Sequence, residues 1–237
     1  MIYNRLQRSL AVALLAAVPV VGSVYAVNAV YAATPAEKPP YPTPNTYSSA
    51  WSLKFEHSLP KRIVVEIPGQ KLSQAFWYMT YTVTNKTDRE LSWLPTFEFL
   101  TEDGKVIQSD GKDIPAVVYE QIKARERKQF LEPASKVAGT IRLGEAQAKD
   151  SVAIWKEPAL ELGHFSIFVS GLSGEVRQFK KVDGNLVELK TGADFKDVKE
   201  NLVILRKTLQ LNFFINGDDV YPGEDEVNEN AEVWVMR

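Results

Sequence analysis

The sequence contains no cysteine among its 237 residues, and this absence excludes several kinds of chemistry. Disulfide bonds, thiolate metal sites, cysteine nucleophiles and a lipid-modified N-terminal cysteine all require that residue. An exported domain without disulfides must depend on its hydrophobic core for stability.

Histidine is scarce, and recognisable catalytic motifs are missing. His57 and His164 are the only imidazoles, and neither belongs to an H-E-x-x-H metal motif. We expect His164 to be structural or exposed, because it shares a strand face with Ser166. The chain also lacks a G-x-S-x-G nucleophile elbow, a P-loop and a G-x-G-x-x-G turn. We therefore predict that the protein is not an enzyme, although a pair of glycosidase-type carboxylates would be invisible in a sequence.

Excess basic charge is missing as well. The formal net charge is -2, and no long block of lysine and arginine occurs. Nucleic-acid binding depends on such positive charge, so we expect no nucleic acid among the partners.

Residues 1–32 have the three-part pattern of a secretory signal peptide. Arg5 and Arg8 precede an uncharged apolar run from Leu10 to Val21, and Ala-x-Ala-like sites end at Ala26 and Ala32. We expect cleavage and export to the periplasm or the extracellular space. Since the uncharged stretch is also long enough to span a bilayer, a retained N-terminal membrane anchor is the alternative.

Residues 33–50 form a proline-rich linker. Prolines stand at positions 35, 39, 40, 42 and 44, a density that favours an extended, solvated spacer. We expect the folded domain to comprise residues 51–237.

The stretch from Phe76 to Ile107 predicts the centre of an all-β domain. Its first half alternates threonines with large apolar residues, the pattern of a half-buried strand. The apolar residues are Trp77, Met79, Tyr81 and Val83. After a polar run at 85–90, Leu91, Trp93, Phe97 and Phe99 resume the alternation. We interpret this as a second strand, antiparallel to the first, with the aromatic side chains of both directed inward.

Further short strands with turns between them favour a sandwich over a βαβ arrangement. We expect strands at 62–67, 137–143, 151–155, 165–170, 176–182, 186–189, 209–215 and 233–236. The Asp183-Gly184-Asn185 sequence indicates a hairpin. One short amphipathic helix is predicted from Pro115 and the charged run 123–128, and we expect it to cap an open end of the sandwich.

The order of four segments carries a family resemblance. These are Phe76–Asn85, Ser151–Trp155, Phe165–Gly174 (FSIFVSGLSG) and Arg206–Phe214 (RKTLQLNFF). In this order the chain resembles uncharacterised secreted bacterial proteins with an Ig-like domain. The resemblance implies an Ig-like antiparallel β-sandwich with one short helix, preceded by a signal peptide and a linker. It implies no activity and no site residues.

An acidic loop follows the strand predicted at 209–215. Carboxylates surround its Pro222-Gly223 turn, and hard oxygen ligands on a reversing loop are what Ca²⁺ requires. The candidate ligands are Asp218, Asp219, Glu224, Asp225 and Glu226. Because their spacing does not match an EF-hand, we expect a solvated connection that holds neither metal nor cofactor.

Trp155 is the candidate ligand-binding residue. Exposed tryptophans often stack on ligands, but Trp77 and Trp93 are in phase with core positions. Trp155 stands at a strand end beside Lys156-Glu157-Pro158, so we expect it to be partly exposed.

These observations predict a non-catalytic, extracytoplasmic Ig-like interaction or structural module of the bacterial cell envelope. Its partner would be an envelope protein or a polysaccharide, and it would contact the membrane only if the N-terminal segment is retained. The alternative is a carbohydrate-binding sandwich, stabilised by Ca²⁺ if the acidic loop holds that ion. A row of exposed aromatic side chains on one sheet face would favour the alternative.

Overall fold

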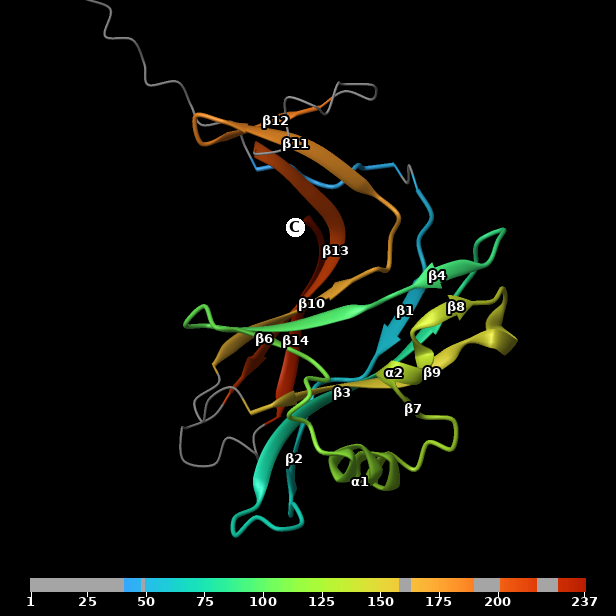
Figure 1. The fold of residues 1–237 in the computed structure, drawn as a ribbon, viewed down its shortest axis with the longest axis vertical. Coiled ribbons are helices and arrows are strands. Elements are labelled where there is room, and N and C mark those ends of the chain that lie inside the picture. The colour runs from blue at the N-terminus through green and yellow to red at the C-terminus, as the bar shows by residue number, and fades with distance from the viewer. Residues whose placement is uncertain (1–40, 48–49, 158–162, 190–200, 217–225) are drawn as a thin grey trace, which may run out of the picture. The chain divides into compact units, whose positions relative to one another are not determined.

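Strands in mostly antiparallel sheets make up most of the structure (Figure 1), so the predicted all-β class is confirmed. The computed structural model describes residues 41–47, 50–157, 163–189, 201–216 and 226–237. All of them belong to the unit Pro39–Arg237, and only this unit is described. None of the helices in these residues has the length and hydrophobicity of a transmembrane span.

The first sheet is built around β3. Its five strands are β1 (Lys54–His57), β2 (Lys61–Val65), β3 (Gln74–Thr84), β7 (Glu132–Pro133) and β9 (Lys149–Lys156). β1 and β2 pair in succession with one edge of β3, and β9 pairs with the other edge. The short β7 runs parallel to β9. β3 is therefore the central strand of this sheet.

The second sheet has seven strands. They are β5 (Thr96–Thr101), β6 (Val106–Gln108), β10 (His164–Ser170), β11 (Val176–Val182), β12 (Asn185–Glu188), β13 (Leu202–Ile215) and β14 (Val227–Met236). β4 (Leu91–Trp93) and β8 (Gly139–Ile141) form a separate pair. The helical elements are α1 (Ala116–Glu126), α2 (Ala134–Val137) and the 3-10 turn η1 (Glu145–Gln147).

The main core lies between the two large sheets. The alternating apolar residues of β3 face inward, as the sequence predicts, and they meet aromatic residues of β5 and β10. Tyr81 stacks on Phe97 with ring centroids 4.6 Å apart, and Phe99 stacks on Phe165 at 4.7 Å. Such aromatic pairs add about 0.5–1.5 kcal/mol each beyond the area that they bury.

The second predicted strand of this region is in fact two strands. β4 ends at Trp93 and β5 begins at Thr96, because Pro95 has no N–H with which to continue a ladder. β4 pairs with β8, whereas β5 pairs with β10 in the second sheet. The expected antiparallel pairing with β3 is therefore wrong. The strands lie in different sheets, and their aromatic side chains meet across the core.

The outer face of β3 is also buried, because α1 covers it. Phe76 and Tyr78 form a second cluster with Val118 and Ile122 of α1. The predicted helix is confirmed, but its expected place at an open end is wrong. The apolar residues on the outer face of the first sheet need a cover, and α1 supplies it.

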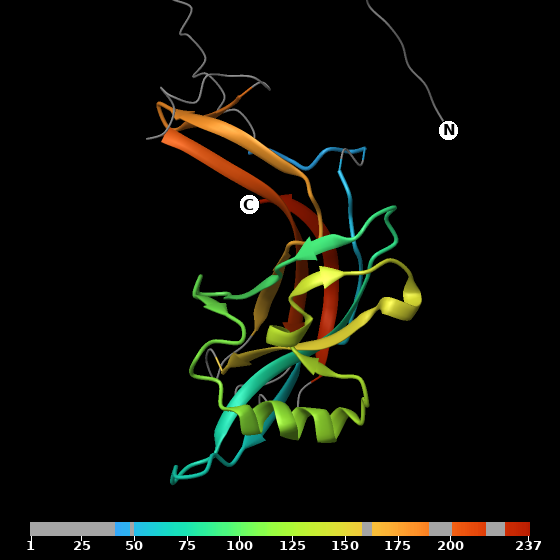
Figure 2. The ribbon, with the colours of Figure 1, turned by 45° about the vertical axis from the view of Figure 1, so that its right-hand side comes forward.

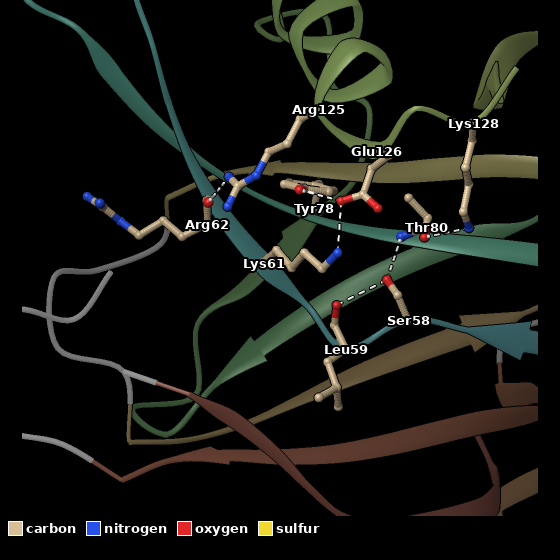
Figure 3. A network of polar contacts seen from close by, with 9 residues as sticks. All are labelled: Ser58, Leu59, Lys61, Arg62, Tyr78, Thr80, Arg125, Glu126 and Lys128. Carbon is tan, nitrogen blue, oxygen red and sulfur yellow. Dashed lines mark hydrogen bonds and ion pairs between the residues drawn. The ribbon is translucent and has the colours of Figure 1, made fainter. Parts of the chain in front are cut away.

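Polar contacts fix α1 on this sheet (Figure 3). Glu126 accepts hydrogen bonds from the Tyr78 hydroxyl at 2.8 Å and from the Lys61 ammonium at 2.9 Å. The Arg125 guanidinium donates to the Arg62 carbonyl at 2.9 Å. Burial raises the pKa of Glu126, but the hydrogen bonds from Lys61 and Tyr78 outweigh it and the net shift is downward.

The N-terminal part of β13 continues past β10 into a three-stranded extension (Figure 2). β13 pairs with β10 near its C-terminal end and with β11 over Leu202–Arg206, while β12 pairs with β11. We call β11, β12 and residues 202–206 the β-arm. It has a small core of its own, in which Phe179 and Leu205 pack with Met236. Its predicted hairpin is confirmed, and the turn residues Asp183 and Gly184 have φ of 49° and 81°.

Replacing Trp77 or Phe97 with alanine should lower the free energy of unfolding by about 3–5 kcal/mol, because each leaves a cavity between the sheets. Both side chains are only 2% exposed. The matched control is Leu72→Ala, at a residue that is 81% exposed, which should stay within about 0.5 kcal/mol of the parent. Denaturant unfolding measures all three variants. If both core variants keep the stability of the parent, the aromatic core is misplaced.

Candidate functional site

A histidine and two glutamates meet where an edge strand of the first sheet faces an edge strand of the second. His57 is the last residue of β1, and Glu229 and Glu232 lie on β14. One imidazole nitrogen and one oxygen from each carboxylate lie within 4.8 Å of one another. We call these three residues the edge cluster.

A β-bulge explains why both glutamates point the same way. Glu229 pairs with Phe213 and Glu232 with Leu211, and the register shifts between these two pairs. Paired residues of an antiparallel ladder share a face, and both partners on β13 are core residues. In a regular strand, two residues three positions apart would lie on opposite faces. The bulge therefore turns both carboxylates towards the first sheet.

The imidazole of His57 has a defined orientation. Its side chain is 10% exposed, and its ring stacks on Phe55 with centroids 5.7 Å apart. Nδ1 lies 3.1 Å from the carbonyl oxygen of Ser58, which can only accept a hydrogen bond. A proton on Nδ1 leaves the lone pair on Nε2, which lies 3.8 Å from the Glu229 carboxylate.

An open cleft of about 500 Å³ lies between α1 and α2. Its floor is formed by Val152 and Ile154 of β9, and its walls include Tyr119, Lys123 and Lys136. The Tyr119 hydroxyl donates to the carbonyl of Leu131 at 2.7 Å. Lys123 and Lys136 are the basic residues that line the cleft.

Asp110 borders this cleft in an unusual backbone conformation. Its φ is 55°, and its N–H donates to the carbonyl of Ile154 at 2.8 Å. Although the residue as a whole is exposed, burial of its carboxyl group raises the pKa of Asp110 to about 6. Hydrogen bonds with Ser109 and with the backbone of Ile154 lower the pKa and offset part of this shift.

Of the predicted site residues, the structure describes Trp155 and Glu226. Trp155 is fully buried in the main core, so the expectation that it is partly exposed is wrong. It pairs with Trp77 across β3 and β9, and its side chain therefore faces the second sheet. The candidate calcium ligands Asp218, Asp219, Glu224 and Asp225 lie outside the described residues, and Glu226 is exposed beside the start of β14.

The edge cluster is what sequence reasoning missed. His57 and Glu229 are far apart in the chain, and no motif joins them. Only the packing of β1 against β14 brings them together. His57 is one of only two histidines in the chain, but the sequence predicts no strand at 54–57.

Comparisons with protein-family models, with curated proteins and with solved structures found no match for this chain.

The raised pKa of Asp110 predicts a pH-dependent effect of Asp110→Asn. A folded-state pKa above the usual value of about 3.9 means that folding favours the protonated carboxyl. That contribution is fully present below about pH 4 and is lost as the pH rises through about 6. Asp110→Asn should therefore melt at a higher temperature than the parent at pH 8 and at a similar temperature at pH 4.

The control is Asp103→Asn, which should change the melting temperature at pH 8 in the opposite direction. The hydrogen bond from Thr101 lowers the pKa of Asp103, so its stabilising contribution is present at neutral pH and lost in acid. The asparagine variant should melt below the parent at pH 8. Equal melting temperatures of Asp110→Asn and the parent at pH 8 would contradict the account.

Proposed function

We propose that this chain is a non-catalytic interaction or structural module of the bacterial cell envelope. Its folded domain would be an Ig-like β-sandwich, exported by the N-terminal segment and tethered by the proline-rich linker. Two facing, mostly antiparallel sheets around an aromatic core support the sandwich assignment. The observation that supports an interaction function is the exposed surface of the β-arm.

Four exposed aliphatic residues lie on one face of the β-arm, among polar side chains. The register places Ile204 opposite Gln178 and Val187 opposite Lys180, so all four side chains lie on one face. Ile204 is 45% exposed and Val187 is 52% exposed. Val176 and Val182 belong to the same face by strand alternation and are exposed as well. Apolar patches of this kind commonly mark protein interaction sites.

The β-arm also offers an unpaired strand edge. β12 pairs with β11 on one side, and no described strand pairs with its other side. Unpaired N–H and carbonyl groups on such an edge can accept an extended segment of a partner as an added strand. Exposed aliphatic side chains beside an open strand edge therefore favour a protein as the partner.

The linker reaches the domain beside the β-arm. The Arg177 guanidinium donates to the carbonyl of Thr43 at 2.8 Å, and the N–H of Asn45 donates to Glu175 at 2.8 Å. Glu175 is buried and forms an ion pair with Lys207 at 3.5 Å. Because the linker contacts the domain at these residues, it would hold the β-arm close to its point of attachment.

The exposure of the tryptophans supports this proposal over the carbohydrate-binding alternative. Trp77, Trp93 and Trp155 are buried, so none of them offers a stacking platform. Trp234 is half-buried, and the Lys207 ammonium lies over its ring at 5.1 Å from the centroid. Of the Phe, Tyr and Trp side chains in the described residues, Tyr41, Tyr47 and Phe130 are the exposed ones, and all three lie outside the strands, so they form no row on a sheet face.

A photocrosslinking amino acid at Val187, introduced into the full chain in its native cells, should give an adduct of defined mass in the envelope fraction. The matched control is the same amino acid at Val64, which is also 52% exposed but lies on β2 of the other sheet. Adding Ile204→Lys to the Val187 probe should weaken the adduct without unfolding the protein, because Ile204 is exposed.

Equal adducts from positions 64 and 187 would contradict the assignment of the β-arm. Recovery of the protein in the cytosolic fraction would contradict the envelope location.

A further inference from the structure

We propose that the edge cluster of His57, Glu229 and Glu232 binds a divalent transition-metal ion, with Zn²⁺ as the best fit. This site is separate from the exposed face of the β-arm and does not depend on the proposed function.

The donor set favours zinc over the hard cations. One imidazole nitrogen and two carboxylate oxygens are available. Ca²⁺ and Mg²⁺ are bound in proteins by oxygen ligands, whereas Zn²⁺ accepts histidine and glutamate together. Three protein ligands leave one position of a tetrahedral ion open, the arrangement found in zinc sites that bind water or a further ligand.

The distances are close to those that a bound ion would impose. Two atoms at about 2.0–2.2 Å from a tetrahedral zinc ion lie about 3.3–3.6 Å apart. The three donor atoms lie within 4.8 Å of one another, and Nε2 of His57 is 3.8 Å from Glu229. Both glutamates are exposed at the residue level, so small side-chain rotations can close the remaining gap.

His57 is already oriented for coordination. Nine-tenths of its side chain is buried, and Nδ1 donates to the Ser58 carbonyl, the second-shell contact typical of zinc-bound histidine. Within the described part of the chain, Nε2 makes no hydrogen bond. A direct ion pair with Glu229 would be expected at about 2.7–2.9 Å, so the observed 3.8 Å is long for that alternative.

Metal binding at this position would connect the two sheets. β1 pairs with β3 in the first sheet, and β14 pairs with β13 in the second. An ion held by His57 from one strand and by both glutamates from the other would stabilise the folded state by mass action.

The test is a titration of the metal-free full chain with Zn²⁺ and, separately, with Ca²⁺ at matched ionic strength. Calorimetry should show one saturable Zn²⁺ site per chain, and Zn²⁺ should raise the melting temperature more than Ca²⁺ does. His57→Gln and Glu232→Gln should each weaken Zn²⁺ binding by at least about tenfold, the lower limit for losing even a second-shell partner.

Glu226→Gln is the matched control, because Glu226 is an exposed glutamate beside β14 but outside the cluster. It should bind Zn²⁺ as the parent does. If His57→Gln fails to fold, Glu232→Gln, at an exposed residue, still tests the site.

Three results would overturn the proposal: no saturable Zn²⁺ binding, Zn²⁺ affinity unchanged in both His57→Gln and Glu232→Gln, or an equal loss in Glu226→Gln. A Ca²⁺-specific rise in melting temperature that disappears in Asp218→Asn and Asp225→Asn would place the ion in the acidic loop instead.

Discussion

The burial of β3 on both of its faces is the constraint on which the rest of the structure depends. Trp77 and Tyr81 face the second sheet, while Phe76 and Tyr78 face α1. One strand thus contributes to both of the larger hydrophobic clusters. Its two edges are occupied as well, by β1 and β2 on one side and by β9 on the other. With no cysteine in the chain, this packing has no covalent support.

The two proposed sites, the edge cluster and the β-arm, lie at the edges of the main core. The β1 strand ends at His57, where the first sheet stops and the edge of the second sheet comes close. β13 is longer than the strands that it pairs with, so it belongs to the main core at one end and to the β-arm at the other. A metal at the edge cluster would connect the sheets, whereas the β-arm would present its exposed aliphatic residues to a partner.

Local patterns predicted most of the strands, because alternation and turn residues act over a few positions. The hairpin at Asp183 and Gly184 is an example, and its left-handed turn geometry is encoded by those two residues. Which strands pair with each other was harder to predict from the sequence. The alternation of Phe97 and Phe99 is the same whether their strand lies beside β3 or opposite it. The prediction for Trp155 was wrong because this residue, although near a strand end, pairs with the buried Trp77 of β3.

The edge cluster could not be predicted for a related reason. Two glutamates three positions apart appear to face opposite ways until the bulge opposite Phe213 is known. Their approach to His57 depends further on how the two sheets pack. Register and inter-sheet packing are set by long-range contacts, which a single sequence does not display.

Native-state hydrogen exchange tests the central role of β3 most directly. Amides of the most deeply packed strand exchange only when the whole domain unfolds, whereas peripheral units open separately at lower free energy. The amides of Tyr78, Met79 and Thr80 should therefore be among the slowest to exchange, and those of β11 and β12 should exchange faster through local opening. If the β3 amides exchange as fast as those of the β-arm, β3 is not the strand around which this fold is stabilised.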